Sequence, residues 1–354
     1  MVHCSVLSAA AKIAIYMEGA VQAPAGKMGL GVLRYSPNQL ACVIDSQFAG
    51  KSVKELTGID REIPIVSNVN QAIALGANVF LLGIAPAGGQ VPADWWPVID
   101  QAVAGKMSLV NGLHDLMAPR YPELSNDPRS GRQFVWDIRI EPVGLTNGNG
   151  AAARLSNRRL LMIGTDMNVG KMTAGLEIGK AAAARGIRTG FVATGQIGIT
   201  ITGAGIPLDA IRVDFASGAV QAEVVRHTEE GAELVIVEGQ GSLVHPGSTA
   251  NLPLLRGGCP THLIMCHRAG QESLVHISSI RIPDVRKLID LYEDLAEACG
   301  TFPRPKTVGI ALNCGHLTPN QADEACRILE ESTGLPCVDV IRHGADRLVD
   351  ELVR

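Results

Sequence analysis

The sequence predicts an α/β protein made of two parallel-sheet domains, and three observations lead to this prediction. A chain of 354 residues exceeds what one hydrophobic core usually serves. Short apolar runs alternate with helix-compatible stretches in both halves, which is the rhythm of βαβ units. An aperiodic stretch with Gly, Asn and Pro at 141–150 separates the two halves. We therefore expect a Rossmann-like domain over 1–145 and a second doubly wound domain over 155–354.

The expected elements follow from the length and periodicity of each run. In the first half we expect strands at 12–17, 41–45, 63–66, 79–84, 108–110 and 134–140, with helices at 71–75 and 95–104. In the second half we expect strands at 159–163, 189–193, 234–237, 262–265, 308–312 and 338–341, with helices at 172–185, 219–230, 283–298 and 321–332. Sheets of this type bind ligands beyond the carboxyl ends of their strands, so candidate site residues are sought there.

Composition excludes several classes of function. Apolar residues make up 46% of the chain and charged residues 19%, which is typical of a folded protein. The formal net charge is −4 and no basic run is interleaved with aromatic residues, so no nucleic-acid partner is expected. The eight cysteines contain no CxxC pair, which favours reduced thiols. Neither an export leader nor an apolar run of membrane-spanning length is apparent. We expect a cytoplasmic homo-oligomer that acts on a small-molecule substrate and has no membrane partner.

A glycine-bracketed loop with a lysine follows the expected strand at 159–163. In such a loop, backbone N–H groups and the following helix N-terminus converge on an anion, and the lysine adds a mobile positive charge. Arg268, after His267 at the end of another strand, could meet the same anion. The predicted phosphate-binding residues are Gly164, Thr165, Asn168, Val169, Gly170, Lys171, Met172, Thr173 and Arg268.

The loop departs from the common P-loop pattern at two points. Five residues separate Gly164 from Gly170, where the common pattern has four, and Met172 occupies the position of the usual Mg²⁺-binding Ser or Thr. The spacing and the opening Gly-Thr-Asp resemble the dethiobiotin synthetase branch of P-loop proteins. This resemblance implies a P-loop NTPase-like fold for the second domain. The metal ligands stay unassigned.

Three acidic residues are candidates for catalysis. Glu238 follows the apolar run Leu234–Val237 directly, where it could act as a general base, bind Mg²⁺ or only brace the glycine turn. Asp166 lies inside the phosphate loop, where its carboxylate could bind a metal or pair with a substrate amine. Asp214 could serve the site or cap a helix.

Further polar residues are predicted to contact substrate. The segment 194–209 is rich in glycine and hydroxyl groups and too irregular for one strand or helix, so we interpret it as a substrate loop or lid. In the first domain, basic side chains could bind the carboxylates of a dicarboxylic substrate, or could be ordinary surface charge. The predicted substrate-binding residues are Thr194, Gln196, Gln240, His245, Lys27, Arg34 and His114.

Taken together, several motifs resemble one family of two-domain bacterial proteins. They are Gly164 to Thr173, Thr194 to Gly198, Val213 to Ala219, Glu238 to Gly241 and Cys266 to Arg268, with Gly26-Lys27, Gly31 to Tyr35, Val43 to Ser46, Ile84 to Gly89 and Asn111 to His114 in the first half. Met172 is typical of that family.

The family is associated with D-glutamate N-acetyltransferase activity. The resemblance implies acetyl-CoA as the acyl donor and the amine of a D-amino acid as the acceptor, and a P-loop could hold the phosphates of CoA. Two other readings stay open. One is an ATP- and Mg²⁺-dependent ligase or kinase in which Thr173 or Glu238 holds the metal. The other is a nucleotide-binding regulator without turnover.

Overall fold

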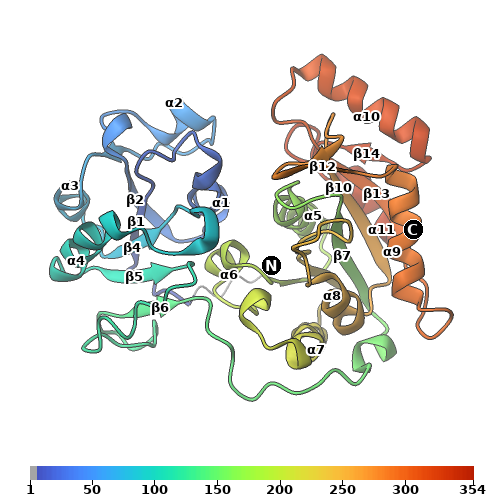
Figure 1. Cartoon of the computed structure of the whole chain (residues 1–354), viewed down its shortest axis with the longest axis horizontal. Coiled ribbons are helices and arrows are strands. Elements are labelled where there is room, and N and C mark those ends of the chain that lie inside the picture. Colours follow the sequence, from blue (N-terminus) through green and yellow to red (C-terminus); the bar gives the residue numbers. More distant parts are fainter. Residues whose placement is uncertain (1–5) are drawn as a thin grey trace. The chain divides into compact units, whose positions relative to one another are not determined.

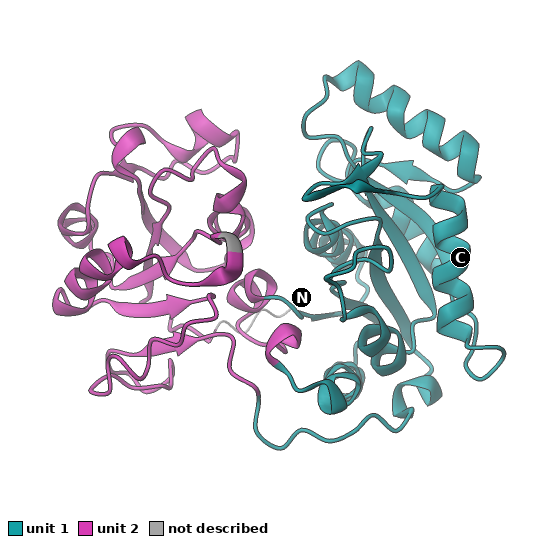
Figure 2. Ribbon diagram, viewed as in Figure 1, with its two compact units in different colours: residues 1, 142–195, 211–354 teal, residues 2–141, 196–210 magenta. Residues whose placement is uncertain are grey.

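The computed structural model describes residues 6–354, so Cys4 lies outside the described part of the chain. The described residues form two compact units, teal and magenta in Figure 2. Unit 1 comprises residues 142–195 and 211–354, and unit 2 comprises the chain up to Glu141 together with 196–210. The chain therefore passes from one unit to the other after Glu141, after Gly195 and after Ala210.

Unit 2 contains a parallel sheet with helices on it, which confirms the predicted Rossmann-like architecture. The strands are β1 (Lys12–Tyr16), β2 (Gln39–Ile44), β3 (Ile65–Val66), β4 (Val79–Leu82), β5 (Ser108–Asn111) and β6 (Val135–Asp137), in the order β3-β2-β1-β4-β5-β6. The helices are α1 (Lys27–Tyr35), α2 (Val53–Thr57), α3 (Val69–Ala74), α4 (Trp96–Ala104) and α6 (Gln196–Thr202). This is the strand order of dinucleotide-binding folds, with β1 beside the switch point.

Aromatic packing fills the core on one face of this sheet. The rings of Tyr16 and Phe80 stack with centroids 5.5 Å apart, and Trp95 meets Tyr16 edge-on at 5.4 Å. Residues of α3 and α4 complete the same cluster. Along β1, neighbouring side chains point to opposite faces, so Met17 faces away from Tyr16. There α1 comes close, because a Cβ at Gly29 would lie only 2.4 Å from the Met17 sulfur.

Unit 1 is the predicted doubly wound domain (Figure 1). Its parallel strands are β7 (Arg158–Gly164), β8 (Thr189–Val192), β9 (Leu234–Val237), β10 (His262–Arg268), β13 (Lys306–Asn313) and β14 (Cys337–Val338), in the order β14-β13-β10-β7-β9-β8. Its helices are α5 (Lys171–Ala184), α7 (Val213–Glu229), α8 (Asn251–Gly258), α9 (Val285–Glu297), α10 (Pro319–Thr333) and α11 (Asp346–Val353). A short antiparallel hairpin, β11 (Ser273–Leu274) and β12 (Ile277–Arg281), follows β10.

Helices cover both faces of the unit 1 sheet. Along β9, Ile236 lies against Gly175 of α5, whereas the next residue, Val237, lies against Gly258 of α8. Because successive residues of a strand point to opposite faces, α5 and α8 cover opposite sides. Both of the strand's faces are buried, which explains why Leu234–Val237 is apolar without alternation.

The central position of β7 assembles the site. This strand pairs with β9 on one side and β10 on the other, with Leu161 opposite Val237 and Gly164 opposite Cys266. The three strands are parallel, so the residues after Gly164, Val237 and Cys266 meet at one edge of the sheet.

The segment 196–210 corrects a prediction. The irregular loop expected from its glycines and hydroxyls begins instead with a helix, α6, which packs on α1 within unit 2. The helix tolerates its threonines because Thr200 Oγ1 donates to the Gln196 carbonyl at 2.7 Å and Thr202 Oγ1 to the Gly198 carbonyl at 2.9 Å. Ile199 and Ile201 are buried. Threonine hydroxyl groups that donate to carbonyls of their own helix do not indicate a loop.

None of the helices described for residues 6–354 is long and apolar enough to cross a membrane.

Candidate phosphate-binding site

The loop between β7 and α5 has the backbone of an anion cradle. Asn168 (φ 57°) and Gly170 (φ 108°) adopt left-handed conformations, and Gly170 is the N-cap of α5. The first N–H groups of a helix have no partner inside the helix, so those that follow Gly170 are oriented toward the loop. A Cβ at Gly164 would lie 3.0 Å from Lys171 Nζ, so glycine at this position leaves space for the ammonium group.

Lys171 supplies a buried positive charge. Its side chain is 7% exposed, and Nζ donates to the Asp166 carbonyl at 2.8 Å. Burial lowers the pKa of Lys171 to about 8, against the opposing effect of Cys266, Asp166 and Glu238. A bound anion stabilises such a buried ammonium group strongly, because it compensates for the hydration that the group lost on folding.

Asp166 acts as a brace in this structure. Its buried carboxylate accepts hydrogen bonds from Met167 N at 2.6 Å, Gln271 Nε2 at 2.7 Å and Val275 N at 2.9 Å. Val275 lies at the turn of the β11–β12 hairpin. Asp166 therefore ties that hairpin to the phosphate loop, and its oxygens are occupied by these contacts.

Thr165 and His267 join the loop to β10. Thr165 Oγ1 and His267 Nδ1 are 2.9 Å apart, and both side chains are buried. Burial lowers the pKa of His267 to about 4, so the imidazole is neutral at neutral pH and supplies no positive charge to an anion. The next residue, Arg268, is exposed and carries the remaining charge at this strand end.

Glu238 lies at the end of β9, beside the phosphate loop, and is 6% exposed. Its Oε2 accepts from Thr194 N at 2.9 Å and from Gly195 N at 3.2 Å, and its carbonyl accepts from Thr194 Oγ1 at 2.9 Å. Gln240 Nε2 donates to the Thr194 carbonyl. The carboxylate therefore holds the last residues of unit 1 before the chain crosses to unit 2.

Gly239 is required by close packing at this point. A Cβ there would lie 1.6 Å from the Met162 carbonyl oxygen and 3.0 Å from Lys171 Cδ. The acid–glycine pair therefore lets β9 end directly against β7 and the lysine stem.

Tyr292 is a residue of this network that sequence reasoning missed. Its hydroxyl accepts from Leu243 N at 3.0 Å, and its one proton lies within reach of two acceptors, Asn251 Oδ1 at 3.1 Å and the Gly164 carbonyl at 3.3 Å. Burial raises the pKa of Tyr292 to about 12. In the sequence Tyr292 is one apolar position of an amphipathic helix, so no local signal marks it.

The remaining predicted residues of unit 1 lie in three different elements. Met172 and Thr173 are half-buried in the first turn of α5. His245 lies in the loop after β9, where Nδ1 accepts from Gly247 N at 3.1 Å. Asp214 is exposed in the first turn of α7, whose N-cap is Arg212, and its carbonyl accepts from Asn147 Nδ2 at 3.0 Å. Among residues 6–354 no group of three or more His, Cys, Asp or Glu could hold a metal ion.

Unit 2 contains a separate basic cluster, formed by Lys27, His114 and Arg139. Arg139 Nη1 lies 3.0 Å from His114 Nε2 and is paired with Asp209, and Nε donates to the Gly112 carbonyl at 2.8 Å. Desolvation, and then the charge of Arg139, lower the pKa of Lys27. Sequence reasoning missed Arg139, which follows a short strand without any motif.

The other two predicted residues of unit 2 are placed differently. Lys27 is the first residue of α1, whereas Arg34 is exposed in the last turn of the same helix. At 1.5 Å per residue, the two α-carbons are about 10 Å apart along the axis. Gln196 is the first residue of α6. The structure therefore groups Lys27 with His114 and separates Arg34 from them.

Comparison with known protein families gives a match for each half of the chain. Residues 146–349 match a family described as a domain of unknown function, DUF1611_C, P-loop domain. Residues 46–141 match its companion, DUF1611_N, Rossmann-like domain.

Three individual proteins extend this similarity over most of the chain. A protein of Pseudoalteromonas named D-glutamate N-acetyltransferase is 37% identical over 80% of this chain and 84% of its own length. A protein of the same name from Tritonibacter scottomollicae is 33% identical over 96% of this chain and 97% of its own length. The crystal structure of a DUF1611 family protein from Anabaena variabilis is 45% identical, covers 97% of this chain and 99% of that one, and superimposes with a TM-score of 0.92.

Proposed function

The chain belongs to the two-domain DUF1611 family, and from this premise we propose that it is an N-acetyltransferase. In the proposed reaction an acetyl group passes from acetyl-CoA to the amine of D-glutamate or a related D-amino acid. The observation that carries the proposal is the match, over 96% of this chain, to a relative named for that reaction. The geometry of the phosphate loop and of the basic cluster supports it.

The phosphate loop fits the charged end of CoA. CoA carries a pyrophosphate and an adenosine 3′-phosphate, and a helix N-terminus with a buried lysine binds such groups. Gly164, Gly170 and Lys171 would hold a phosphate, since the glycines leave room beside the ammonium group. Met172 at the usual Mg²⁺ position is compatible with this ligand, because a cofactor that donates an acyl group needs no metal at its phosphates.

Of the candidate bases, the position in the sheet favours Glu238. Both carboxylate oxygens of Asp166 accept hydrogen bonds that brace the phosphate loop, whereas Glu238 follows β9 at the edge where sheets of this type bind their ligands. A base must take a proton from the substrate ammonium, after which the amine attacks the thioester carbon, the C–S bond breaks and CoA leaves as the thiol. Glu238, at a carboxyl strand end next to the phosphate loop, is our proposed base.

The basic cluster of unit 2 supports a dicarboxylic acceptor. Guanidinium and ammonium groups bind carboxylates through charge-assisted hydrogen bonds. Arg139 already binds the carboxylate of Asp209 in this cluster, and Lys27 adds a second positive charge that Arg139 acts on. We propose that this cluster binds a carboxylate of the acyl acceptor.

The proposal is tested by an assay of the purified full-length protein with acetyl-CoA and D-glutamate. We expect release of CoA thiol and formation of N-acetylglutamate, detected by mass, with the protein's own thiols subtracted by a blank that lacks acceptor. L-glutamate and D-aspartate test the choice of acceptor. Lys171→Ala should lower kcat/KM for acetyl-CoA by about 10- to 100-fold. Lys180→Ala, which changes an exposed lysine of the same helix, should leave it unchanged.

Parallel reactions with ATP and Mg²⁺ distinguish the other readings. Phosphate release that depends on a carboxylate substrate, without CoA thiol release, would replace the proposal with an ATP-dependent ligase or kinase. Binding of CoA or ATP in calorimetry, without either product, would replace it with a nucleotide-binding regulator.

A further inference from the structure

Three cysteines lie together at the edge of the unit 1 sheet, away from the phosphate loop. Cys314 follows β13, Cys326 lies in α10 and Cys337 begins β14. The thiol of Cys326 is within hydrogen-bond reach of both Cys314 and Cys337. In the sheet, β13 and β10 stand between β14 and β7, so this cluster is separate from the candidate acetyltransferase site.

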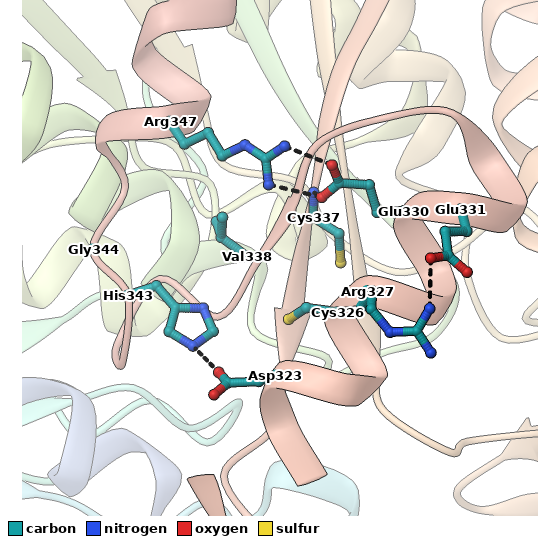
Figure 3. Close-up of a pocket in the computed structure, with 10 residues that line it drawn as sticks. All are labelled: Asp323, Cys326, Arg327, Glu330, Glu331, Cys337, Val338, His343, Gly344 and Arg347. Atoms are coloured by element: carbon teal, nitrogen blue, oxygen red, sulfur yellow. Dashed lines mark hydrogen bonds and ion pairs between the residues drawn. The ribbon is translucent and has the colours of Figure 1, made fainter. Parts of the chain in front are cut away.

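A pocket gives small molecules a route to two of these thiols. It has a volume of about 570 Å³, and its lining includes Cys326, Cys337, Asp323 and His343. Figure 3 shows Cys326 and Cys337 pointing into this space from α10 and β14, with His343 beside them. The two cysteines are only 6% and 2% exposed, so a compact reagent has better access than a bulky one.

The charges around the pocket are paired among themselves. Arg347 binds Glu330 through two hydrogen bonds at 2.5 and 2.7 Å, and His343 Nε2 lies 2.9 Å from Asp323 Oδ1. Arg327 is paired with Glu331 and Glu324. A pocket of neutralised charges does not select a charged ligand, which leaves the thiols as its distinctive chemical groups.

Cys326 has the surroundings of the more reactive thiol. Hydrogen bonds from Cys314 and Cys337, and the nearby His343, lower the pKa of Cys326, whereas the same hydrogen bonds raise the pKa of Cys314 and Cys337. The direction follows from chemistry, because a sulfur that accepts two hydrogen bonds is stabilised as thiolate and its donors are held as thiols.

We propose that Cys326 and Cys337 form a peroxide-reactive dithiol, which is oxidised to a disulfide between α10 and β14. The Cys326 sulfur attacks one oxygen of the peroxide, the O–O bond breaks, and the other oxygen leaves as water, so that Cys326 becomes a sulfenic acid. The Cys337 sulfur then attacks the Cys326 sulfur, the S–O bond breaks, and a second water leaves with the remaining thiol proton. Two thiols are oxidised and one hydrogen peroxide is reduced to two waters.

Tryptic peptides of this chain separate the relevant cysteines. Cleavage after Lys306, Arg327 and Arg342 places Cys314 and Cys326 on peptide 307–327 and Cys337 on peptide 328–342. A disulfide between Cys326 and Cys337 therefore joins two peptides. A disulfide between Cys314 and Cys326 instead leaves one linear peptide lighter by two hydrogens.

The experiment treats the reduced full-length protein with equimolar hydrogen peroxide, blocks the remaining thiols by alkylation and maps the digest by mass spectrometry. We expect the cross-linked pair 307–327 with 328–342, its loss in Cys326→Ser and Cys337→Ser, and its persistence in Cys314→Ser. Cys299→Ser, an exposed cysteine outside the cluster, is the matched control and should keep the pair.

Other outcomes overturn the proposal without relying on a variant's stability. Wild-type protein in which Cys326 and Cys337 stay fully alkylatable, while exposed Cys299 is oxidised, would show that the pair is unreactive. A lighter linear peptide 307–327, or a cross-link that survives in Cys326→Ser, would assign the chemistry to Cys314 instead.

Discussion

The first crossovers of the two sheets, β1 to α1 in unit 2 and β7 to α5 in unit 1, have the same topology but different chemistry. In unit 2 the loop amides bond to the loop's own carbonyls, as Ala20 N does to Met17 O at 2.8 Å and Gly26 N to Ala23 O at 3.0 Å. Its acid, Glu18, accepts from Ser46 N at 2.9 Å. In both units a glycine caps the helix and a lysine begins it, but Lys171 of unit 1 is buried whereas Lys27 of unit 2 is exposed. Topology places a loop at the ligand-binding edge, and its side chains decide which ligand is attracted.

The largest expected effect concerns Glu238, the acid that follows β9 beside the unit 1 crossover. Glu238→Gln keeps the size and an acceptor for Thr194 N and Gly195 N but cannot take a proton. Turnover should fall by roughly 10²–10⁴-fold, as expected for loss of general base catalysis. Steady-state kinetics measure the effect. Glu233→Gln is the control, because Glu233 is exposed and directly precedes β9 at its amino end. Activity within a few-fold of wild type would reduce Glu238 to a brace and shift attention to Asp166 or Asp214.

Lys171 tests the contrast between the two loops directly. Lys171→Ala removes a charged donor that would hydrogen-bond to a phosphate of acetyl-CoA. The variant should therefore bind acetyl-CoA about 10- to 100-fold more weakly than the wild type. Because the cationic form binds phosphate and its pKa is about 8, affinity of the wild type should weaken as pH rises above that value. Calorimetry at several pH values measures both effects. Unchanged affinity in Lys171→Ala would contradict the phosphate-cradle interpretation.

His267 should make the unit 1 site sensitive to acid. Its pKa is about 4 in the folded protein and 6.5 as the ordinary value, so between these values the unfolded chain binds more protons and the free energy of unfolding falls as pH drops. When the pH drops, the free energy of unfolding should fall by about 1–3 kcal/mol less in His267→Gln than in the wild type. Urea denaturation at pH 7 and pH 4.5 gives the difference. His227 and His262, whose pKa values burial also lowers, stay in both proteins. Exposed His276→Gln is the control, and an equal acid response in His267→Gln would refute the assignment.

The smallest expected effect concerns unit 2. Lys27→Ala should raise KM for the acyl acceptor by about 3- to 10-fold with little change in kcat, because one partly exposed ammonium contributes about 1 kcal/mol to carboxylate binding. Arg34→Ala, at the other end of α1, should raise KM less. Lys51→Ala, an exposed lysine of unit 2, is the control. Equal KM values for Lys27→Ala and wild type would remove the basic cluster from the acceptor site.

Much of the architecture followed from local pattern. Each predicted strand has a counterpart, because parallel strands buried on both faces are continuous apolar runs between turn residues. The helices α1, α2, α8 and α11 were not predicted, and α6 was taken for a loop. Glycine and threonine in α6 depress helix propensity, and the packing of Ile199 and Ile201 outweighs that preference.

For the site, the sequence by itself determined the phosphate loop, because strand, glycines, lysine and helix are contiguous from Leu160 to Thr173. It also determined that Glu238 ends a buried strand. Only the tertiary structure decided that Asp166 braces the β11–β12 hairpin, that His267 is neutral, and that Tyr292 and Arg139 join their networks. These partners come from segments distant in the chain, and a hydrogen bond or a desolvated charge depends on where those segments meet in space, which no local run of residues encodes.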